Sequence, residues 1–280
     1  MAIRESAVSR LSQVASFVRL NGYVRISELA QVVGVSEITI RRDLKKLALE
    51  GHLRSVPGGA TPDGITGSMI TFKREVGLHR AEKMAIGKAA AALVKDGDSV
   101  LFDGGSSTYF VARALVGRAI HVFTNSLPVA EVFSADSRVD VILLGGVLYP
   151  ATGMTLGTIS ESQLKSFHPK WLFMGVGGIE PGGFSNSNLP LVSTERVMME
   201  TAENVVIVAD SSKFGRQALA RLGILKDADY LVTDSGIPPS ARKWIREAGV
   251  ELVISSGKGQ HSPTNNEGSM GMTERGKAAA

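Results

Sequence analysis

The residues most suited to chemistry in this sequence form a short run, LFDGGSST, at positions 101–108. Apolar residues lead into Asp103, and two glycines and three small hydroxyl residues follow it. This order is typical of a strand that ends in a tight turn and presents backbone N–H groups to an anion at a helix start. A carboxylate at such a place can also act as a general base on a bound substrate. The run therefore indicates either a binding loop or part of a catalytic site.

Similar chemistry follows other apolar runs along the chain. Seven such runs are separated by stretches of helical periodicity, which favours a mostly parallel α/β sheet. Ligands of such sheets bind beyond the carboxyl ends of the strands. We therefore expect the polar residues after these runs to converge on one crevice. The runs are 99–102, 120–123, 139–144, 171–174, 205–209, 230–232 and 250–254.

The groups expected in this crevice suit a phosphorylated polyol. Glycines let backbone N–H groups approach a phosphate, and small hydroxyl residues add donors. Lys213 could neutralise the anion, with an ordinary surface cation as the alternative. Glu195, at a predicted helix start, is equally well explained as a helix cap or as a ligand contact. The predicted ligand-binding residues are Asp103, Gly104, Gly105, Ser106, Ser107, Thr124, Asn125, Ser126, Gly146, Gly177, Glu195, Asp210 and Lys213.

The composition narrows the class of protein. With 280 residues the chain exceeds a typical domain of about 100–200 residues, so two folded units are expected. The lack of cysteine excludes disulfides and cysteine nucleophiles and is compatible with a reducing cytoplasm. We find no signal peptide, no run of the ~18–20 apolar residues that span a membrane, and no metal-ligand spacing among the histidines. We therefore expect a cytoplasmic protein with no membrane partner, metal or cofactor.

The excess positive charge lies in the first fifth of the chain. Residues 1–60 hold nine Lys/Arg and five Asp/Glu, whereas the other 220 residues hold 22 of each. This asymmetry is typical of a small nucleic-acid reader joined to a neutral domain. Residues 8–18 and 26–33 are helical in pattern, Gly34 makes a turn, and Ser36 caps a helix to about Glu50. With a short β wing after it, this order predicts a winged helix-turn-helix whose motif covers about 24–43.

The second helix of this motif has two distinct faces when it is rotated by 100° per residue. Ile40, Leu44 and Leu47 form an apolar stripe, and Asp43 lies beside it as a structural partner for a cation. The opposite face carries cations around an isoleucine, a mixture that suits thymine methyls and phosphates in a major groove. A plain three-helix packing module is the alternative. The predicted DNA-binding residues are Ser36, Ile38, Thr39, Arg41, Arg42, Lys45 and, on the wing, Arg54.

Roles for these residues follow from their chemistry. Arg42 is the best candidate for bidentate reading of a guanine, which is worth ~1–3 kcal/mol of discrimination. Arg41, Lys45 and Arg54 are better suited to phosphate contacts. Such contacts make the affinity for DNA fall as the salt concentration rises. Ser36 and Thr39, near the helix start, suit phosphate or base-edge contacts.

The stretch VSEITIRRDLKKLALEGHLRSVPGGA, residues 35–60, resembles the DNA-binding end of the DeoR family of bacterial transcriptional regulators. The family pattern is Val-Ser-x-x-Thr-Ile-Arg-Arg-Asp-Leu, followed by Leu, Gly and a wing that ends in Gly-Gly-Ala. Each of these positions is matched in place by this sequence. The matching residues are Val35, Ser36, Thr39, Ile40, Arg41, Arg42, Asp43, Leu44, Leu47, Gly51, Gly58, Gly59 and Ala60.

The second half resembles the sensor domain of the same family, which is similar in fold to ribose-5-phosphate isomerase and glucosamine-6-phosphate deaminase. Many members carry Asp-x-Gly-Thr-Thr where this chain has Asp103-Gly104-Gly105-Ser106-Ser107, a change that keeps the hydroxyls and loses methyl groups. The resemblance covers about residues 3–255. Its matching pieces are FDGGSST at 102–108, TNS at 124–126, LLGG at 143–146, MGVGGI at 174–179, VADSSKFGR at 208–216 and LVTD at 231–234.

The pattern and the resemblance together predict an α/β protein, in which an N-terminal winged helix-turn-helix is joined to a C-terminal, mostly parallel α/β sheet domain. The expected segments are 3–58 for the DNA-binding domain, 59–71 for a linker, 72–255 for the sensor domain and 256–280 for a disordered tail.

Two functions from different classes fit this organisation. The first is a transcriptional regulator, by resemblance a repressor of a carbohydrate or related operon, that a phosphorylated sugar or polyol releases from operator DNA. The second is a sugar-phosphate isomerase or deaminase with an accessory DNA-binding module, since Asp103, Glu195 and Asp210 could serve as acid and base. The regulator is favoured because the resemblance spans both halves. It implies a homo-oligomer, a dimer or tetramer, on repeated half-sites. Family members respond to sugar phosphates, glycerol 3-phosphate or opine-type sugar phosphodiesters, and the sequence does not rank these.

Overall fold

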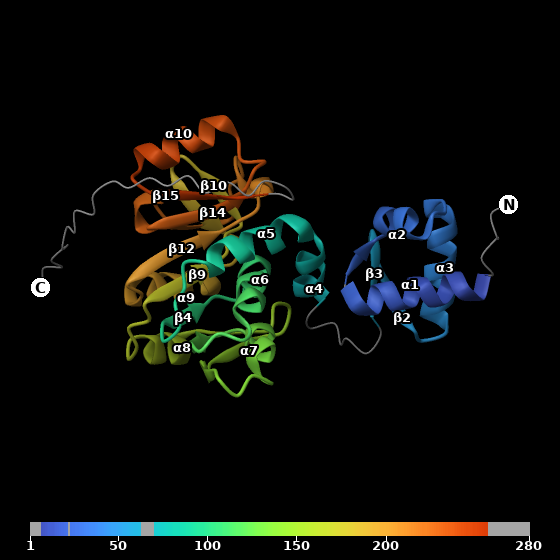
Figure 1. Ribbon diagram of the computed structural model, residues 1–280, viewed down its shortest axis with the longest axis horizontal. Helices are drawn as coiled ribbons and strands as arrows, with labels where there is room; N and C mark the ends of the chain where they lie inside the picture. The colour runs from blue at the N-terminus through green and yellow to red at the C-terminus, as the bar shows by residue number, and fades with distance from the viewer. Residues whose placement is uncertain (1–6, 22, 63–69, 257–280) are drawn as a thin grey trace, which may run out of the picture.

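The N-terminal domain is a three-helix unit closed by a small antiparallel sheet, and it forms the right-hand lobe in Figure 1. The computed structural model describes residues 7–21, 23–62 and 70–256. One apolar cluster that includes Val14, Leu29 and Ile40 holds the domain together. Its elements are α1 (Ala7–Asn21), β1 (Val24–Arg25), α2 (Ile26–Val33), α3 (Glu37–Leu49), β2 (Leu53–Val56) and β3 (Gly59–Pro62).

The turn between α2 and α3 forms as the sequence predicts. Gly34 has a φ of 71°, a left-handed conformation that glycine adopts without steric cost. The Ser36 hydroxyl then caps α3 by accepting a hydrogen bond from the Thr39 amide at 3.3 Å. Along α3, Ile40, Leu44 and Leu47 are buried. The predicted apolar stripe is therefore confirmed.

Asp43 is held by a cation from another helix, as predicted. Its carboxylate oxygen Oδ2 lies 2.7 Å from Nε of Arg10 on α1. Asp43 is 5% exposed, so that an unpaired charge at this position would be costly. The ion pair fixes α1 against the back of α3.

The wing is longer than the sequence predicts. Gly59–Pro62, which we expected to begin a linker, is strand β3 and pairs with both β1 and β2. The pairing is tight, because a Cβ at Gly59 would lie 2.2 Å from the carbonyl oxygen of Val24. Glycine at position 59 therefore allows a close approach of the two strands. Residues 63–69 of the expected linker lie outside the described residues.

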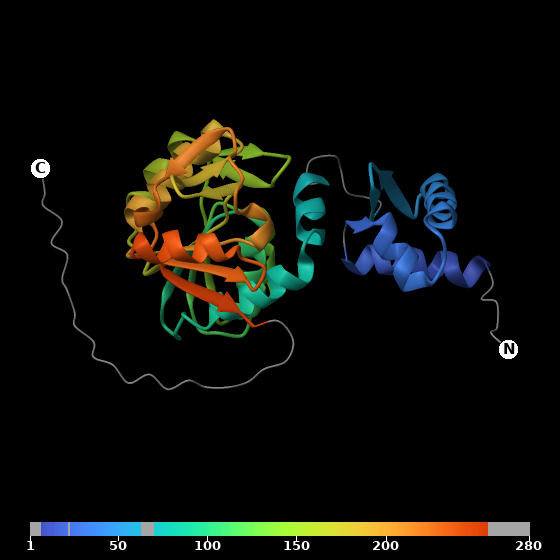
Figure 2. The same cartoon turned by 90° about the horizontal axis from the view of Figure 1, so that it is seen from above.

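The helical pattern after residue 70 is two helices and not one. The first, α4 (Ile70–Gly77), stands between the two lobes, and α5 (Arg80–Ala91) packs on the larger one (Figures 1 and 2). The break lies at His79, which has a φ of 50°. A non-glycine residue in this conformation is uncommon and here ends one helix and starts the next.

All seven predicted apolar runs form strands of one parallel sheet, which confirms the predicted fold class. Across the sheet the strand order is β15-β14-β12-β9-β4-β5-β6. The strands are β4 (Ser99–Phe102), β5 (His121–Thr124), β6 (Asp140–Leu143), β9 (Trp171–Met174), β12 (Asn204–Val208), β14 (Tyr230–Asp234) and β15 (Glu251–Ser255).

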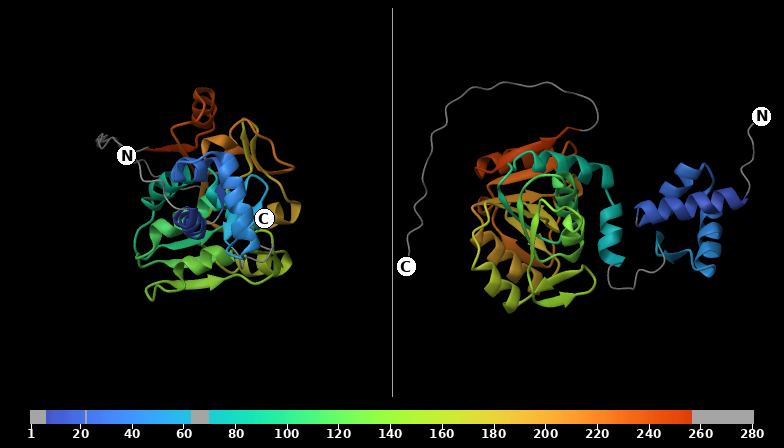
Figure 3. Two further views of the ribbon diagram at one scale, coloured as in Figure 1. Left: turned by 90° about the vertical axis from the view of Figure 1, so that its right-hand side faces the viewer. Right: turned by 60° about the horizontal axis from the view of Figure 1, so that its bottom comes forward.

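Helices cover both faces of this sheet (Figure 3). Alternate strand residues point to opposite faces, so Phe102 and Val206 belong to one apolar cluster and Leu101 and Ile207 to the other. The first cluster is completed by α5, α6 (Ser106–Leu115) and α7 (Leu127–Phe133). The second is completed by α8 (Thr158–Leu164), α9 (Leu189–Thr201) and α10 (Pro239–Glu247).

Two small antiparallel sheets and two 3₁₀ turns are absent from the sequence prediction. These strands have at most four residues, too few for their pattern to separate them from loops. They are β7 (Val147–Tyr149) with β8 (Met154–Leu156), and β10 (Gly178–Glu180) with β11 (Gly183–Asn186) and β13 (Ala220–Gly223). The turns are η2 (Ser211–Lys213) and η3 (Leu225–Asp227).

The expected tail lies outside the described residues beyond position 256. Within the described ranges, each helix is too short or too polar to cross a lipid bilayer. The same ranges hold no group of three histidine or carboxylate side chains placed to hold a metal ion.

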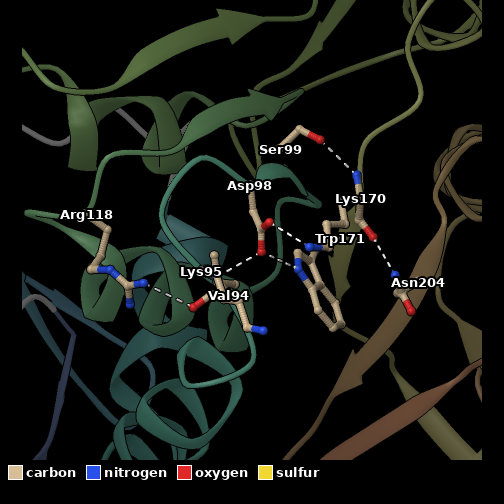
Figure 4. A network of polar contacts seen from close by, with 8 residues as sticks. All are labelled: Val94, Lys95, Asp98, Ser99, Arg118, Lys170, Trp171 and Asn204. Carbon is tan, nitrogen blue, oxygen red and sulfur yellow. Dashed lines mark hydrogen bonds and ion pairs between the residues drawn. The ribbon is translucent and has the colours of Figure 1, made fainter.

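Asp98 ties together the amino ends of the central strands (Figure 4). Its carboxylate accepts hydrogen bonds from Lys170 Nζ at 2.8 Å, Trp171 Nε1 at 2.9 Å and the Lys95 amide at 2.9 Å. Burial by itself raises the pKa of Asp98, but these hydrogen bonds outweigh it, and the pKa lies below its ordinary value. The carboxylate is therefore a structural anchor at the end of the sheet opposite the candidate ligand site.

We expect Asp98→Asn to lower the free energy of unfolding by about 2 kcal/mol, because charged hydrogen bonds of this kind contribute about 1.5–3 kcal/mol. The folded pKa is lowered, so the carboxylate's contribution is present above its unfolded pKa and is lost as the pH falls through the folded pKa. In urea unfolding, the difference in the free energy of unfolding between the wild type and Asp98→Asn should thus be constant between pH 5 and pH 8. Asp140→Asn, whose parent side chain is 88% exposed, is the control and should change stability by less than about 0.5 kcal/mol. Equal stability of the two variants would contradict this assignment.

Candidate functional site

Three neighbouring strands bring buried polar groups to the carboxyl end of the sheet. Asp103 follows β4, Gly175 follows β9 and Asp210 follows β12, and these strands are adjacent. The Gly175 amide donates a hydrogen bond to Asp103 Oδ2 at 3.3 Å, and the amides of Gly104 and Gly105 also face this carboxylate. The N–H groups of the expected phosphate cradle are thus directed at the protein's own acid.

A second acid, Glu195, lies close to Asp103. It is fully buried within α9, which begins at Leu189 and is capped by Asn188. The sequence interpretation of Glu195 as a possible helix cap is therefore wrong, because the helix starts six residues before it. Asn186 Nδ2 donates to Glu195 Oε1 at 2.6 Å and orients the carboxyl group.

The two acids raise each other's cost of ionisation. Burial raises the pKa of Asp103 to about 6, against the lowering effect of the three backbone amides. Burial, followed by the charge of Asp103, raises the pKa of Glu195 well above its ordinary value. Like charges that are buried close together cannot both ionise cheaply. The protonated form of Glu195 is therefore favoured over what an exposed glutamate would show.

Several buried oxygens in this region have no hydrogen-bond partner among the described residues. They are Asp103 Oδ1, Asn125 Oδ1, Glu195 Oε2 and Asp210 Oδ2. Each belongs to a side chain that is at most 3% exposed. A buried polar atom without a partner costs about 1–3 kcal/mol, so these four oxygens lower the stability of the ligand-free fold. Such a set suits a ligand that is rich in hydroxyl groups.

Cations border this cluster. Lys213, in η2, is half-buried, and its charge contributes to the surroundings of Lys83. Lys83, on α5, is 1% exposed, and its Nζ lies 4.0 Å from Asp210 Oδ2. Lys83 follows no apolar run and belongs to no motif that would predict a site residue. Its signal is its spacing, because it falls on the buried face of α5 with Ile86, Gly87, Ala90 and Ala91.

Other predicted residues are held by the fold itself. Thr124 Oγ1 donates to the Phe102 carbonyl at 2.9 Å and accepts from the Ser126 amide at 3.0 Å. The Ser126 hydroxyl caps α7. A Cβ at Gly146 would lie 2.4 Å from Ser160 Oγ, and one at Gly177 would lie 3.1 Å from Asn186 Oδ1. These four positions are accounted for by packing and hydrogen bonding.

The start of α6 remains available for ligand contact. Ser106 and Ser107 are its first two residues, and Ser106 is half-buried. A Cβ at Gly104 would lie 2.3 Å from Met154 of β8, so the β7–β8 hairpin closes over this loop. Gly175 and Asn186, which sequence reasoning missed, complete the cluster through one backbone and one side-chain donor.

On the N-terminal domain, α3 presents a cationic face around an apolar residue. Ile38 is 76% exposed, and Arg42 and Lys45 are exposed beside it. Ser36 and Thr39 share a hydrogen bond of 2.9 Å between their hydroxyls, and Arg41 lies 3.4 Å from Glu37. Arg54, on β2, is exposed.

A groove of about 530 Å³ runs between α3 and the wing. Arg41 and Lys45 line its helix side, and Ser55 and Pro57 line its wing side. Two cations on one wall and a polar wing on the other are groups that commonly contact a phosphate backbone. The groove adjoins the face of α3 that carries Ile38.

Comparisons with known proteins assign both halves of the chain. The family model described as the DeoR-like helix-turn-helix domain matches residues 10–64. The model described as the DeoR C terminal sensor domain matches residues 78–235. The two matches lie on the two lobes of the structure and together cover most of the chain.

Three curated relatives are similar over nearly their whole length. The uncharacterized HTH-type transcriptional regulator YulB of Bacillus subtilis is 31% identical, over 87% of this chain and 95% of its own. The HTH-type transcriptional repressor CsqR of Escherichia coli is 29% identical, over 88% and 94%. The glycerol-3-phosphate regulon repressor of Haemophilus influenzae is 30% identical, over 89% and 97%.

Among solved structures, ribose 5-phosphate isomerase A from Neisseria gonorrhoeae is similar with a TM-score of 0.36 and 17% sequence identity. The match covers 53% of this chain and 56% of that one.

We expect Asp103→Asn to stabilise the protein, and more so as the pH rises. The folded pKa of about 6 exceeds the ordinary 3.8, so the wild type is favoured at low pH and loses stability as the pH rises through the folded pKa. Between pH 5 and pH 8 the advantage of the variant should grow by about 1–1.5 kcal/mol, as measured by urea unfolding.

Asp136→Asn is the matched control with the opposite sign. Hydrogen bonds from Arg138 and the Gly117 amide lower the pKa of Asp136 to about 2, so that its stabilising effect is already complete at pH 5. This variant should be less stable than the wild type by an amount that does not change between pH 5 and pH 8. A pH-independent effect of Asp103→Asn would show that Asp103 does not titrate in this range.

Proposed function

Because the chain belongs to the DeoR family of transcriptional regulators, we propose that it represses a carbohydrate or related operon and is released from operator DNA by a phosphorylated sugar or polyol. The exposed Ile38 among the cations of α3 is the main support for the proposed DNA binding. The buried oxygens without partners at the carboxyl end of the sheet are the main support for the proposed ligand binding.

In the proposed complex α3 lies in the major groove. Ile38 contacts thymine methyl groups, and Arg42 reads a guanine with two hydrogen bonds. Arg41, Lys45 and the wing residue Arg54 contact phosphates on either side. Ser36 and Thr39, at the start of α3, lie where a phosphate or base edge passes. The groove between α3 and the wing supports this orientation, since Arg41 and Lys45 both line it.

In the proposed ligand complex the polar cluster holds the hydroxyl groups of a phosphorylated sugar or polyol. Asp103, Asn125, Glu195 and Asp210 supply oxygens that accept hydrogen bonds from the ligand hydroxyl groups. Lys213 and the amides at the start of α6 contact the phosphate, which is attracted by positive charge and by a helix N-terminus. Sugar phosphates, glycerol 3-phosphate and opine-type sugar phosphodiesters all carry this combination of groups.

We further propose that the protein acts as a homo-oligomer, a dimer or tetramer, through its sensor domain. Support comes from the edge of the sheet, where β6 and the β7–β8 hairpin expose apolar side chains. Ile142 is 41% exposed, Leu143 43%, Val147 72%, Leu148 47% and Tyr149 41%. An exposed apolar edge of this size is typical of an association surface.

An enzymatic role in sugar-phosphate isomerisation or deamination is the alternative, and one observation favours it. A carboxyl group with a pKa of about 6 is well suited to general base catalysis near neutral pH. We propose regulation without turnover, because both halves of the chain match regulators. Incubation with ribose 5-phosphate and glucosamine 6-phosphate, followed by product analysis, separates the two. Turnover at enzymatic rates would overturn the proposal.

We expect Arg42→Ala to remove sequence-specific DNA binding. A duplex selected from random DNA by the wild type serves as the probe, and fluorescence anisotropy measures its affinity. The loss of one bidentate contact should weaken specific binding by about 1–3 kcal/mol, with a smaller effect on unrelated DNA. Arg246→Ala on α10 removes the same charge from the other domain and is the control. If Arg42→Ala kept full affinity for the selected duplex, the placement of α3 would be wrong.

We expect Asp210→Asn and Lys213→Ala to abolish the response to ligand without loss of DNA binding. A thermal-shift panel of ribose 5-phosphate, glucosamine 6-phosphate, glycerol 3-phosphate and an opine-type sugar phosphodiester identifies the ligand for the wild type. Each variant should then bind the selected duplex normally in both the presence and the absence of that ligand. A variant that is still released by it as readily as the wild type would exclude that residue from the site.

A further inference from the structure

Lys83 is the largest side chain that is almost fully buried in the described part of the protein. Burial lowers its pKa, and the nearby charge of Asp210 acts against this effect. A buried ammonium is costly unless its N–H groups meet acceptors. Among the described residues, Lys83 donates one hydrogen bond, of 2.6 Å, to the backbone carbonyl oxygen of Glu75. That carbonyl belongs to the last turn of α4.

On its other side, the ammonium group of Lys83 lies near the carboxylate of Asp210. Lys83 Nζ and Asp210 Oδ2 are 4.0 Å apart, too far for a hydrogen bond, and Oδ2 has no other partner among the described residues. A ligand oxygen about 2.8 Å from each atom would satisfy both. A ligand hydroxyl group can accept from the ammonium and donate to the carboxylate at once. A phosphate oxygen in this position would be repelled by Asp210.

The helix that Lys83 holds is also the helix between the two lobes. On the sensor side, Phe72 of α4 packs edge-on against Tyr109 of α6, with ring centroids 5.6 Å apart. On the other side, α4 contacts β1 and β3 of the DNA-binding domain. Figure 1 and Figure 2 both show α4 in this intermediate position.

The contact with the DNA-binding domain is close and involves backbone. A Cβ at Gly77 would lie 2.2 Å from the carbonyl oxygen of Tyr23, so that α4 ends directly against this residue. The ring of Tyr23 in turn packs on the wing, because a Cβ at Gly59 would lie 2.7 Å from its Cε2 atom. A displacement of the last turn of α4 therefore reaches the base of the wing through Tyr23.

We propose that Lys83 is a hydroxyl-recognising residue of the ligand site and that, through its hydrogen bond to the Glu75 carbonyl, it transmits ligand binding to α4, Tyr23 and the wing. This inference rests on the proposed function. A ligand hydroxyl between Lys83 and Asp210 draws the ammonium from the last turn of α4, and the position of Gly77 against Tyr23 changes with it. Ligand and DNA then favour different positions of one helix, which is the physical requirement for coupling.

The first test needs neither DNA nor ligand. Hydrogen–deuterium exchange of the full chain compares the wild type with Lys83→Met, which keeps the length of the side chain and removes its donors. We expect faster exchange of the α4 amides in Lys83→Met, because the last turn loses its anchor. Lys88→Met, on the exposed face of the same helix, is the control and should behave as the wild type. Unchanged exchange in α4 overturns the anchoring role of Lys83.

The second test uses the phosphorylated polyol that gives the largest thermal shift with the wild type, with orthophosphate as the probe without a carbon-bound hydroxyl. By calorimetry, Lys83→Met should bind the polyol phosphate at least about tenfold more weakly, as expected for a lost hydrogen bond to a charged group. Its affinity for orthophosphate should equal that of the wild type. Lys83→Arg, which keeps charge and donors, should restore part of the affinity. Equal affinity of Lys83→Met and the wild type for the polyol phosphate overturns the recognition role.

The third test separates transmission from ligand binding. Gly77→Ala places a methyl group against the Tyr23 carbonyl and touches no residue of the ligand site. It should bind the polyol phosphate with wild-type affinity, while the factor by which that ligand weakens binding of the selected duplex changes by about threefold or more. Gly182→Ala, which has open space around it, is the control and should keep the wild-type factor. If the ligand weakens duplex binding by the same factor in Gly77→Ala as in the wild type, the route through α4 is overturned. If the ligand does not weaken duplex binding by the wild type at all, the result counts instead against the proposed function.

Discussion

The structure depends on one costly arrangement, the burial of several carboxyl oxygens without partners at the carboxyl ends of adjacent parallel strands. Asp103 and Glu195 lie close enough to disfavour each other's charge, and Asp210 faces a lysine that does not reach it. The parallel sheet brings Asp103 and Asp210 together because the carboxyl ends of its strands lie side by side, and α9 adds Glu195 to them. In the proposed complex, a ligand that supplies the missing donors recovers the free energy that these unpaired oxygens cost the ligand-free fold.

The remainder of the molecule compensates for that cost or uses it. At the amino ends of the strands, the Asp98 carboxylate accepts three hydrogen bonds and stabilises the sheet that carries the acids. On the other side of the ligand cluster, α4 connects the sensor domain to the wing through Phe72 and Gly77. The DNA-binding domain has its own apolar core and its own ion pair. In the proposed mechanism, recognition of the ligand and recognition of DNA thus use separate surfaces joined by one short helix.

Much of the fold follows from the sequence, because its strands are buried on both faces and form continuous apolar runs. The recognition helix follows equally well, since the stripe of Ile40, Leu44 and Leu47 fixes which residues are exposed. The short strands β7, β8, β10, β11 and β13 have no such pattern. In the candidate site, the sequence predicts Asp103, Asn125 and Asp210 because each follows an apolar run. It does not predict the proximity of Glu195 to Asp103 or the burial of Lys83, because both depend on how helices far apart in sequence pack on the sheet.

The most direct test of the central claim is a reciprocal binding measurement on the wild-type protein. The affinity for the selected duplex is measured with and without saturating ligand, and the affinity for the ligand is measured with and without saturating duplex. We expect each partner to weaken binding of the other, and thermodynamic linkage requires that it do so by the same factor. Independent binding, with neither affinity changed by the other partner, would contradict it.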